Sequence, residues 1–134
     1  MENNQSVIQF YDFNDQQKRG RQLPECSISI WYNINEKHRT YGCTLSNDIY
    51  SEFDYVRIGK IGSDNCLVFS EAGIKLYGKN RKQNKKGNLV FSSKGFVELI
   101  FPEIQDRNHE GKGRKIFQLN QINDEVLIIK NEVK

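Results

Sequence analysis

The chain has 134 residues, 37% of them hydrophobic, and a formal net charge of +3 at pH 7. This length suits one domain, and the balance of apolar and charged residues excludes a disordered chain. No apolar run approaches the roughly 20 residues of a membrane-spanning helix, and the first residues have neither the basic nor the apolar part of a signal peptide. We therefore expect a cytoplasmic protein with no membrane association.

Three cysteines, Cys26, Cys43 and Cys66, are widely spaced along the chain. They form no Cys-x-x-Cys pair, and no histidine flanks them at the spacing of metal ligands. An odd number of isolated cysteines is typical of reduced, mostly apolar side chains in a reducing compartment. We expect three free thiols and no metal or other cofactor.

The first element in chain order is an N-terminal arm, residues 1–25. Its β-forming segment Val7–Phe13 predicts one strand. A polar linker follows and contains a basic cluster, Lys18, Arg19 and Arg21, before Pro24 marks the boundary to the next strand.

The segment 26–70 predicts two β-hairpins around a short helix. Ser46 is expected to cap the helix Asp48–Phe53, because its hydroxyl can accept from the following backbone N–H groups. Apolar alternation and a Gly-Ser-Asp-Asn turn predict the strands Ser27–Ile34, Thr40–Leu45, Tyr55–Ile61 and Cys66–Phe69.

The segment 74–129 predicts the same order of elements. A helix Lys94–Phe101 is expected, capped by Ser92 or Ser93 and stopped by Pro102, and a loop Glu103–Gly113 follows it. The expected strands are Ile74–Tyr77, Asn88–Phe91, Lys115–Leu119 and Glu125–Ile129. The repeated order predicts an internal duplication, with 28–69 and 74–129 as two copies of one unit inside a single domain, 26–134.

The first copy resembles a known family through TLSNDIYSEF followed by DYVRIGKIGSDNCLVF, residues 44–69. These residues are similar to the AbrB/SpoVT-type swapped-hairpin domain, and the second copy matches it through Val90–Ser92 and Ile116–Ile129. The resemblance implies a mainly β fold, a compact barrel in either the swapped-hairpin or the related double-psi arrangement. Two copies in one chain imply a pseudo-twofold monomer, with a homodimer as the alternative.

DNA binding is the function that the resemblance implies, in a transcription regulator or an antitoxin. The family's DNA contacts come largely from arginines on the first hairpin and near the helix. Here the expected first helix has no basic residue and the second has only Lys94, while Ser46 or Ser92 replaces the proline usual at helix entry. The mode of contact implied by the family therefore differs in this chain.

Positive charge is concentrated at the turn expected between Tyr77 and Asn88. Without this turn's five cations the remaining chain would carry −2. They are Lys79, Arg81, Lys82, Lys85 and Lys86. Such a turn suits phosphate contacts, and Asn80, Gln83 and Asn84 suit base edges.

Further phosphate contacts are expected from Lys37 and Arg39 in the first turn, and from Lys18, Arg19 and Arg21 in the arm.

Three alternatives to nucleic-acid binding remain open for the basic turn and the fold. The turn can be a solvated, aggregation-blocking surface, it can bind an acidic protein partner, or the barrel can hold a small ligand.

No group of residues predicts catalysis, so we expect a protein that is not an enzyme. The run Gly111-Lys112-Gly113-Arg114 lacks the frame of a phosphate-binding loop. Trp31 and Tyr32 lie on an expected strand and are assigned to sheet packing. His38 and His109 lie in expected turns and are assigned to solvent.

Overall fold

The computed structural model of the chain describes residues 23–78 and 87–133. The expected strand Val7–Phe13 and the two basic segments 18–21 and 79–86 lie outside the described residues. Within them the fold is mainly β, as the sequence predicts.

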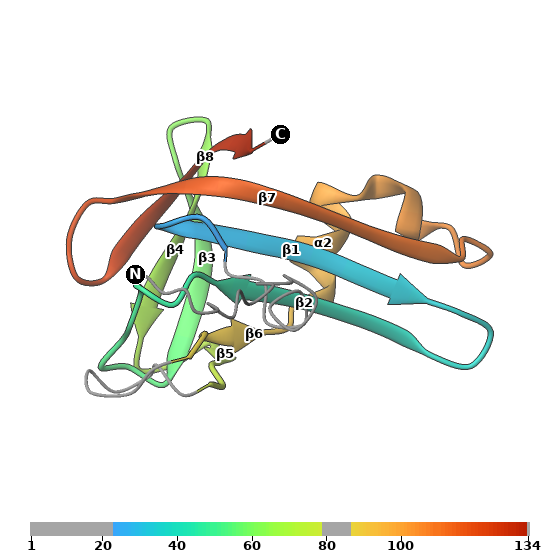
Figure 1. Cartoon of the computed structure of the whole chain (residues 1–134), viewed down its shortest axis with the longest axis horizontal. Coiled ribbons are helices and arrows are strands. Elements are labelled where there is room, and N and C mark those ends of the chain that lie inside the picture. The colour runs from blue at the N-terminus through green and yellow to red at the C-terminus, as the bar shows by residue number, and fades with distance from the viewer. Residues whose placement is uncertain (1–22, 79–86, 134) are drawn as a thin grey trace, which may run out of the picture.

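The described residues contain eight strands: β1 Ser27–Ile34, β2 Arg39–Leu45, β3 Tyr55–Ile61, β4 Asp64–Ser70, β5 Ile74–Lys75, β6 Val90–Phe91, β7 Gly111–Gln121 and β8 Val126–Val133. They form one antiparallel sheet in the order β5-β3-β4-β8-β7-β1-β2-β6. The sheet nearly closes into a barrel, because Tyr77, just after β5, forms a bridge with Val90 of β6. In Figure 1, β7, β1 and β2 run side by side, and β3 and β4 run steeply across them.

The strands that flank the hairpins β1–β2 and β3–β4 come from later parts of the chain. The hairpin β1–β2 pairs with β7 and β6, whereas the hairpin β3–β4 pairs with β5 and β8. No pairing joins the two hairpins directly among the described strands. Each hairpin of the first half is therefore completed by strands of the second half.

Strand alternation places the core inside the barrel. In β1, Ile28, Ile30, Tyr32 and Ile34 are buried, as their spacing predicts. They pack with buried side chains from the other strands and from the helix, among them Cys43, Leu45, Val56, Leu67, Phe69, Phe91, Phe96, Val97, Leu127 and Ile129.

The helix α2, Lys94–Ile100, begins and ends close to its predicted bounds. Ser93 caps it by accepting from the N–H of Phe96 at 3.2 Å, and a 3₁₀ helix, η2 Pro102–Gln105, follows directly. Pro102 lacks the N–H that would continue the α-helical bonding pattern. In the described parts of the chain, no helix combines the length and apolar character needed to cross a membrane.

The predicted helix Asp48–Phe53 is wrong: this segment forms turns and bends. Ser46 does not cap a helix, because its hydroxyl accepts from the N–H of Ser27 at 2.9 Å. The Asp48 carboxylate accepts from the N–H of Cys26 at 3.0 and 3.1 Å. Both polar side chains therefore tie this segment to the start of β1, and the N–H of Ile49 donates to the Ser46 carbonyl in a single turn.

The predicted loop Glu103–Gly113 is also wrong in part. Its first residues form η2, and β7 begins at Gly111 and continues to Gln121, well beyond the predicted strand Lys115–Leu119. Pairing explains the difference, because β7 pairs with every residue of β1, from Gly111 opposite Ile34 to Gln118 opposite Ser27. Pairing with β1 keeps the Gly-Lys-Gly-Arg run of β7 extended, although the composition of this run favours a turn.

Candidate nucleic-acid interface

Trp31 lies on the outer face of the barrel, at the middle of β1. It pairs with Gly42 of β2 on one side and with Arg114 of β7 on the other. Its neighbours Ile30 and Tyr32 point into the core, so strand alternation places the half-buried indole outside. The expectation of sheet packing holds for both aromatic residues, but on opposite faces of the sheet.

Gly42 sets the position of the Trp31 ring. A Cβ on Gly42 would lie 2.3 Å from Cζ2 and 2.9 Å from Nε1 of the indole. The ring therefore occupies the space that any other residue would fill with its side chain. The indole N–H has no hydrogen-bond acceptor within the described chain, so it can donate to a bound molecule.

Two cavities border the ring. The first, named here the Trp31 groove, has a volume of about 390 Å³. It is lined by Trp31, Tyr32, Asn33, Lys112, Gly113 and Arg114. The second is a pocket of about 250 Å³, lined by Leu23, Ser29, Trp31, Thr44, Asn88 and Arg114. Among the residues described, no carboxylate lines either cavity.

Two exposed cations form the β7 side of the Trp31 groove. Arg114 donates from Nε to Oγ of the buried Ser29 at 2.8 Å, which holds its stem along the sheet. Its terminal nitrogens have no acceptor, and neither Arg114 nor Lys112 forms an ion pair, in the part of the chain described. Unpaired cations beside an aromatic ring can bind an anionic, flat ligand.

The pocket beside Arg114 is also where the expected basic segments join the described structure. Asn88 follows Lys86 by two positions, and Leu23 follows Arg21 by two positions. Asn88 is held in place because its Nδ2 donates to the carbonyl of Leu45 at 2.7 Å. Chain connectivity therefore brings the attachment points of both basic segments to the same pocket.

Lys37 and Arg39 lie elsewhere, at the opposite end of β2. Six residue steps separate Arg39 from Leu45, roughly 20 Å along the strand. Three acceptors also engage the Arg39 side chain: the Ile104 carbonyl and the Tyr41 hydroxyl, each at 2.9 Å, and the Arg107 carbonyl at 3.4 Å. The structure thus does not bring these two predicted residues together with Asn88.

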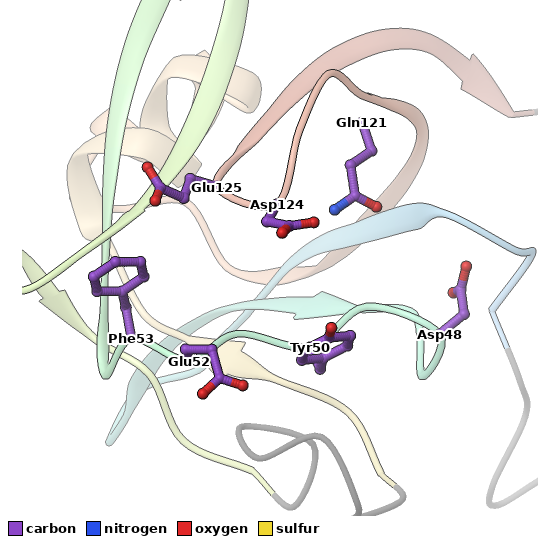
Figure 2. Close-up of a pocket in the computed structure, with 7 residues that line it drawn as sticks. All are labelled: Asp48, Tyr50, Glu52, Phe53, Gln121, Asp124 and Glu125. Carbon is purple, nitrogen blue, oxygen red and sulfur yellow. The ribbon is translucent and has the colours of Figure 1, made fainter.

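A third cavity, of about 300 Å³, is acidic. It lies between the segment after β2 and the β7–β8 turn, and its carboxylates come from both sides (Figure 2). The lining residues are Asp48, Tyr50, Glu52, Phe53, Gln121, Asp124 and Glu125. No described group of three or more His, Cys, Asp or Glu side chains is arranged to hold a metal ion. This cavity repels anions and so is no part of a phosphate-binding surface.

All three cysteines have free thiols. Burial raises the pKa of Cys43 to about 12, so its thiol stays protonated. Burial and then the Asp48 carboxylate raise the pKa of Cys26.

His109 is half-buried, and its Nε2 lies 3.1 Å from the Tyr32 hydroxyl in a hydrogen bond, so its assignment to solvent is wrong. It anchors the chain before β7 to the core.

Comparisons of the chain with models of protein families, with curated proteins and with solved structures give no match. The candidate interface therefore depends on the chain's own geometry.

Sequence reasoning missed the Trp31 groove, although a signal for it was present. The run Gly111-Lys112-Gly113-Arg114 has two cations at the period-2 spacing of one strand face. Read as a strand, it places both cations on the same side of the sheet. Pairing with Trp31 depends on β1–β7 register, which no local pattern contains.

Proposed function

We propose that this protein binds nucleic acid without catalysing a reaction, in a regulatory role, with double-stranded DNA as the ligand that the family resemblance implies. The observation that carries the proposal is a pair of exposed cations, Lys112 and Arg114, that border the Trp31 groove and have no ion-pair partner among the described residues. Arg114 also borders the pocket that contains Leu23 and Asn88, the residues two positions after the basic segments 18–21 and 79–86. Phosphates are the ligand class that such an unpaired cationic surface favours.

The same proposal includes the internal duplication and the swapped hairpins. The strand order supports it: exchanging β1–β4 with β5–β8, in order, leaves the order around the nearly closed barrel unchanged. Under this exchange the contact β4–β8 maps onto itself, and β1–β7 maps onto β5–β3. The first hairpin of each half pairs with the second hairpin of the other, which is the defining feature of a swapped-hairpin arrangement. We propose a pseudo-twofold monomer acting in the cytoplasm, where free thiols persist.

The decisive experiment is fluorescence anisotropy of a labelled DNA duplex, titrated with protein over a salt series. The intact protein should show a steep linear fall of log K with log salt. A variant with Lys79, Arg81, Lys82, Lys85 and Lys86 all replaced by alanine should lose about four to five units of this slope, since each phosphate contact contributes about 0.9. At moderate salt its binding should be lost.

Thermal unfolding provides the control, because substitutions of charged residues in an expected polar turn should leave the melting temperature nearly unchanged. Unchanged affinity of the folded variant would contradict the role of these five cations. Failure of the intact protein to bind duplex or single-stranded DNA even at low salt would contradict the whole proposal and would favour an acidic protein partner.

A further inference from the structure

We propose that the Trp31 groove binds one unpaired base of a single-stranded nucleic acid. The base stacks against the indole, and Lys112 and Arg114 contact the adjoining phosphates. This inference rests on the proposed function and deepens it, because it adds a subsite for an unpaired base beside cations that can contact the phosphates of duplex or single-stranded nucleic acid.

The geometry provides a fixed stacking partner. One side of the indole rests over Gly42, and the ring also borders the groove, whose other residues come from β1 and β7. Since a β-sheet carries the ring, it is positioned before any ligand arrives. Stacking on a fixed aromatic ring is how sheet surfaces bind single strands, because every base has a π-face.

The polar groups around the groove fit the rest of a nucleotide. Lys112 and Arg114 provide positive charge, and Arg114 uses only its Nε on Ser29. Asn33 borders the same groove, and its amide has no hydrogen-bond partner in the described chain. An amide both donates and accepts, so it can pair with a base edge, adenine above all.

Duplex DNA does not fit this groove, because its bases are stacked on one another and their faces are covered. An acidic protein would use the two cations but would leave the ring without a specific partner. The combination of a half-buried ring with two cations that have no ion-pair partner and an amide that has no hydrogen-bond partner among the described residues therefore favours a single strand.

Trp31 makes the test direct because it is the only tryptophan in the chain. Its fluorescence is followed while an oligothymidine of about 12 nucleotides, within the usual site sizes for single strands, is added to the protein. A duplex of the same length is the comparison. We expect strong quenching with the single strand and little change with the duplex, while anisotropy of the labelled DNA reports binding in both cases.

Trp31→Ala should weaken single-strand affinity about 5- to 150-fold, the usual range for loss of one stacking partner, and should change duplex affinity less than about twofold. Leu99→Ala is the matched control, since Leu99 is an exposed apolar residue on α2. Replacing both Lys112 and Arg114 by glutamine should reduce the single-strand salt slope by about 1.4.

Single-strand affinity that is unchanged in folded Trp31→Ala overturns the groove assignment but leaves the proposed function standing. If that variant does not fold, the intact protein still decides: saturating single-strand binding without a change in Trp31 emission overturns the assignment. If the intact protein binds neither single-stranded nor duplex DNA, the proposed function itself is refuted.

Discussion

The Trp31 groove and the acidic cavity lie toward opposite ends of β7 and are opposite in chemistry. The groove contains two cations and no described carboxylate, whereas the cavity contains four carboxylates and no described cation. The long strand β7 connects them, with Lys112 at one end and Gln121 at the other, roughly 30 Å apart. The net charge of +3 conceals this separation.

The distribution of charge, and not its sum, therefore defines the candidate surface. A polyanion is attracted to one end of β7 and repelled at the other, so a bound strand would have a preferred direction away from the acidic cavity. The two regions also differ in how their side chains are held. In the groove, Trp31 lies over Gly42 and Arg114 donates to Ser29, whereas in the cavity the Asp48 carboxylate accepts from the N–H of Cys26.

The largest effect is expected from a substitution that moves the Trp31 ring and keeps every charge. Gly42→Ala places a Cβ within 2.3 Å of the indole, so Trp31 must leave its position. Single-strand affinity should fall toward the loss expected for Trp31→Ala, by about 5- to 150-fold, with an unchanged salt slope. Fluorescence titration measures both.

Gly95→Ala is the matched control for this substitution. A Cβ at Gly95 meets nothing within 4 Å, and the residue lies inside α2. Alanine there should stabilise the protein by about 0.5–1 kcal/mol and leave binding unchanged. Full binding by Gly42→Ala would show that the ring's position over Gly42 is irrelevant.

The electrostatic effect of the acidic cavity can be tested at Cys26, because Asp48 lines the cavity and contacts the backbone of Cys26. Its pKa is raised by burial and by Asp48, so the thiolate is scarce at neutral pH. Asp48→Asn should lower this pKa toward its ordinary value, and the pH at which alkylation of Cys26 becomes fast should move down. Cys43, with a pKa of about 12 and a fully buried side chain, should stay unmodified in both proteins. An unmoved alkylation profile would mean that Asp48 does not act on this thiol.

The smallest effect is expected from neutralising the acidic cavity. Asp124→Asn combined with Glu125→Gln should raise nucleic-acid affinity less than about twofold, because the distance to the groove exceeds the Debye length of about 8–10 Å. Anisotropy at two salt concentrations measures this change. A large gain, or a loss, would mean that the cavity contacts the bound strand and that the two regions are one site.

Local patterns in the sequence were sufficient for a large part of the fold. The bounds of β1 and β3, a cap at Ser92 or Ser93 and the stop at Pro102 all follow from side-chain alternation, a capping hydroxyl and a missing N–H. Each depends on residues within a few positions of one another, which is the range over which sequence patterns act.

The tertiary structure alone decided the rest. Ser46 and Asp48 look like the start of a helix but bind the backbone of Ser27 and Cys26, about twenty positions away. The Gly-Lys-Gly-Arg run becomes strand because β1 pairs with it, and this register brings Lys112 and Arg114 to Trp31. The physical reason is that strand pairing and side-chain contacts across the barrel involve residues far apart in the sequence. Hydrogen bonds to these distant backbone groups outweigh the local conformational preference of a segment.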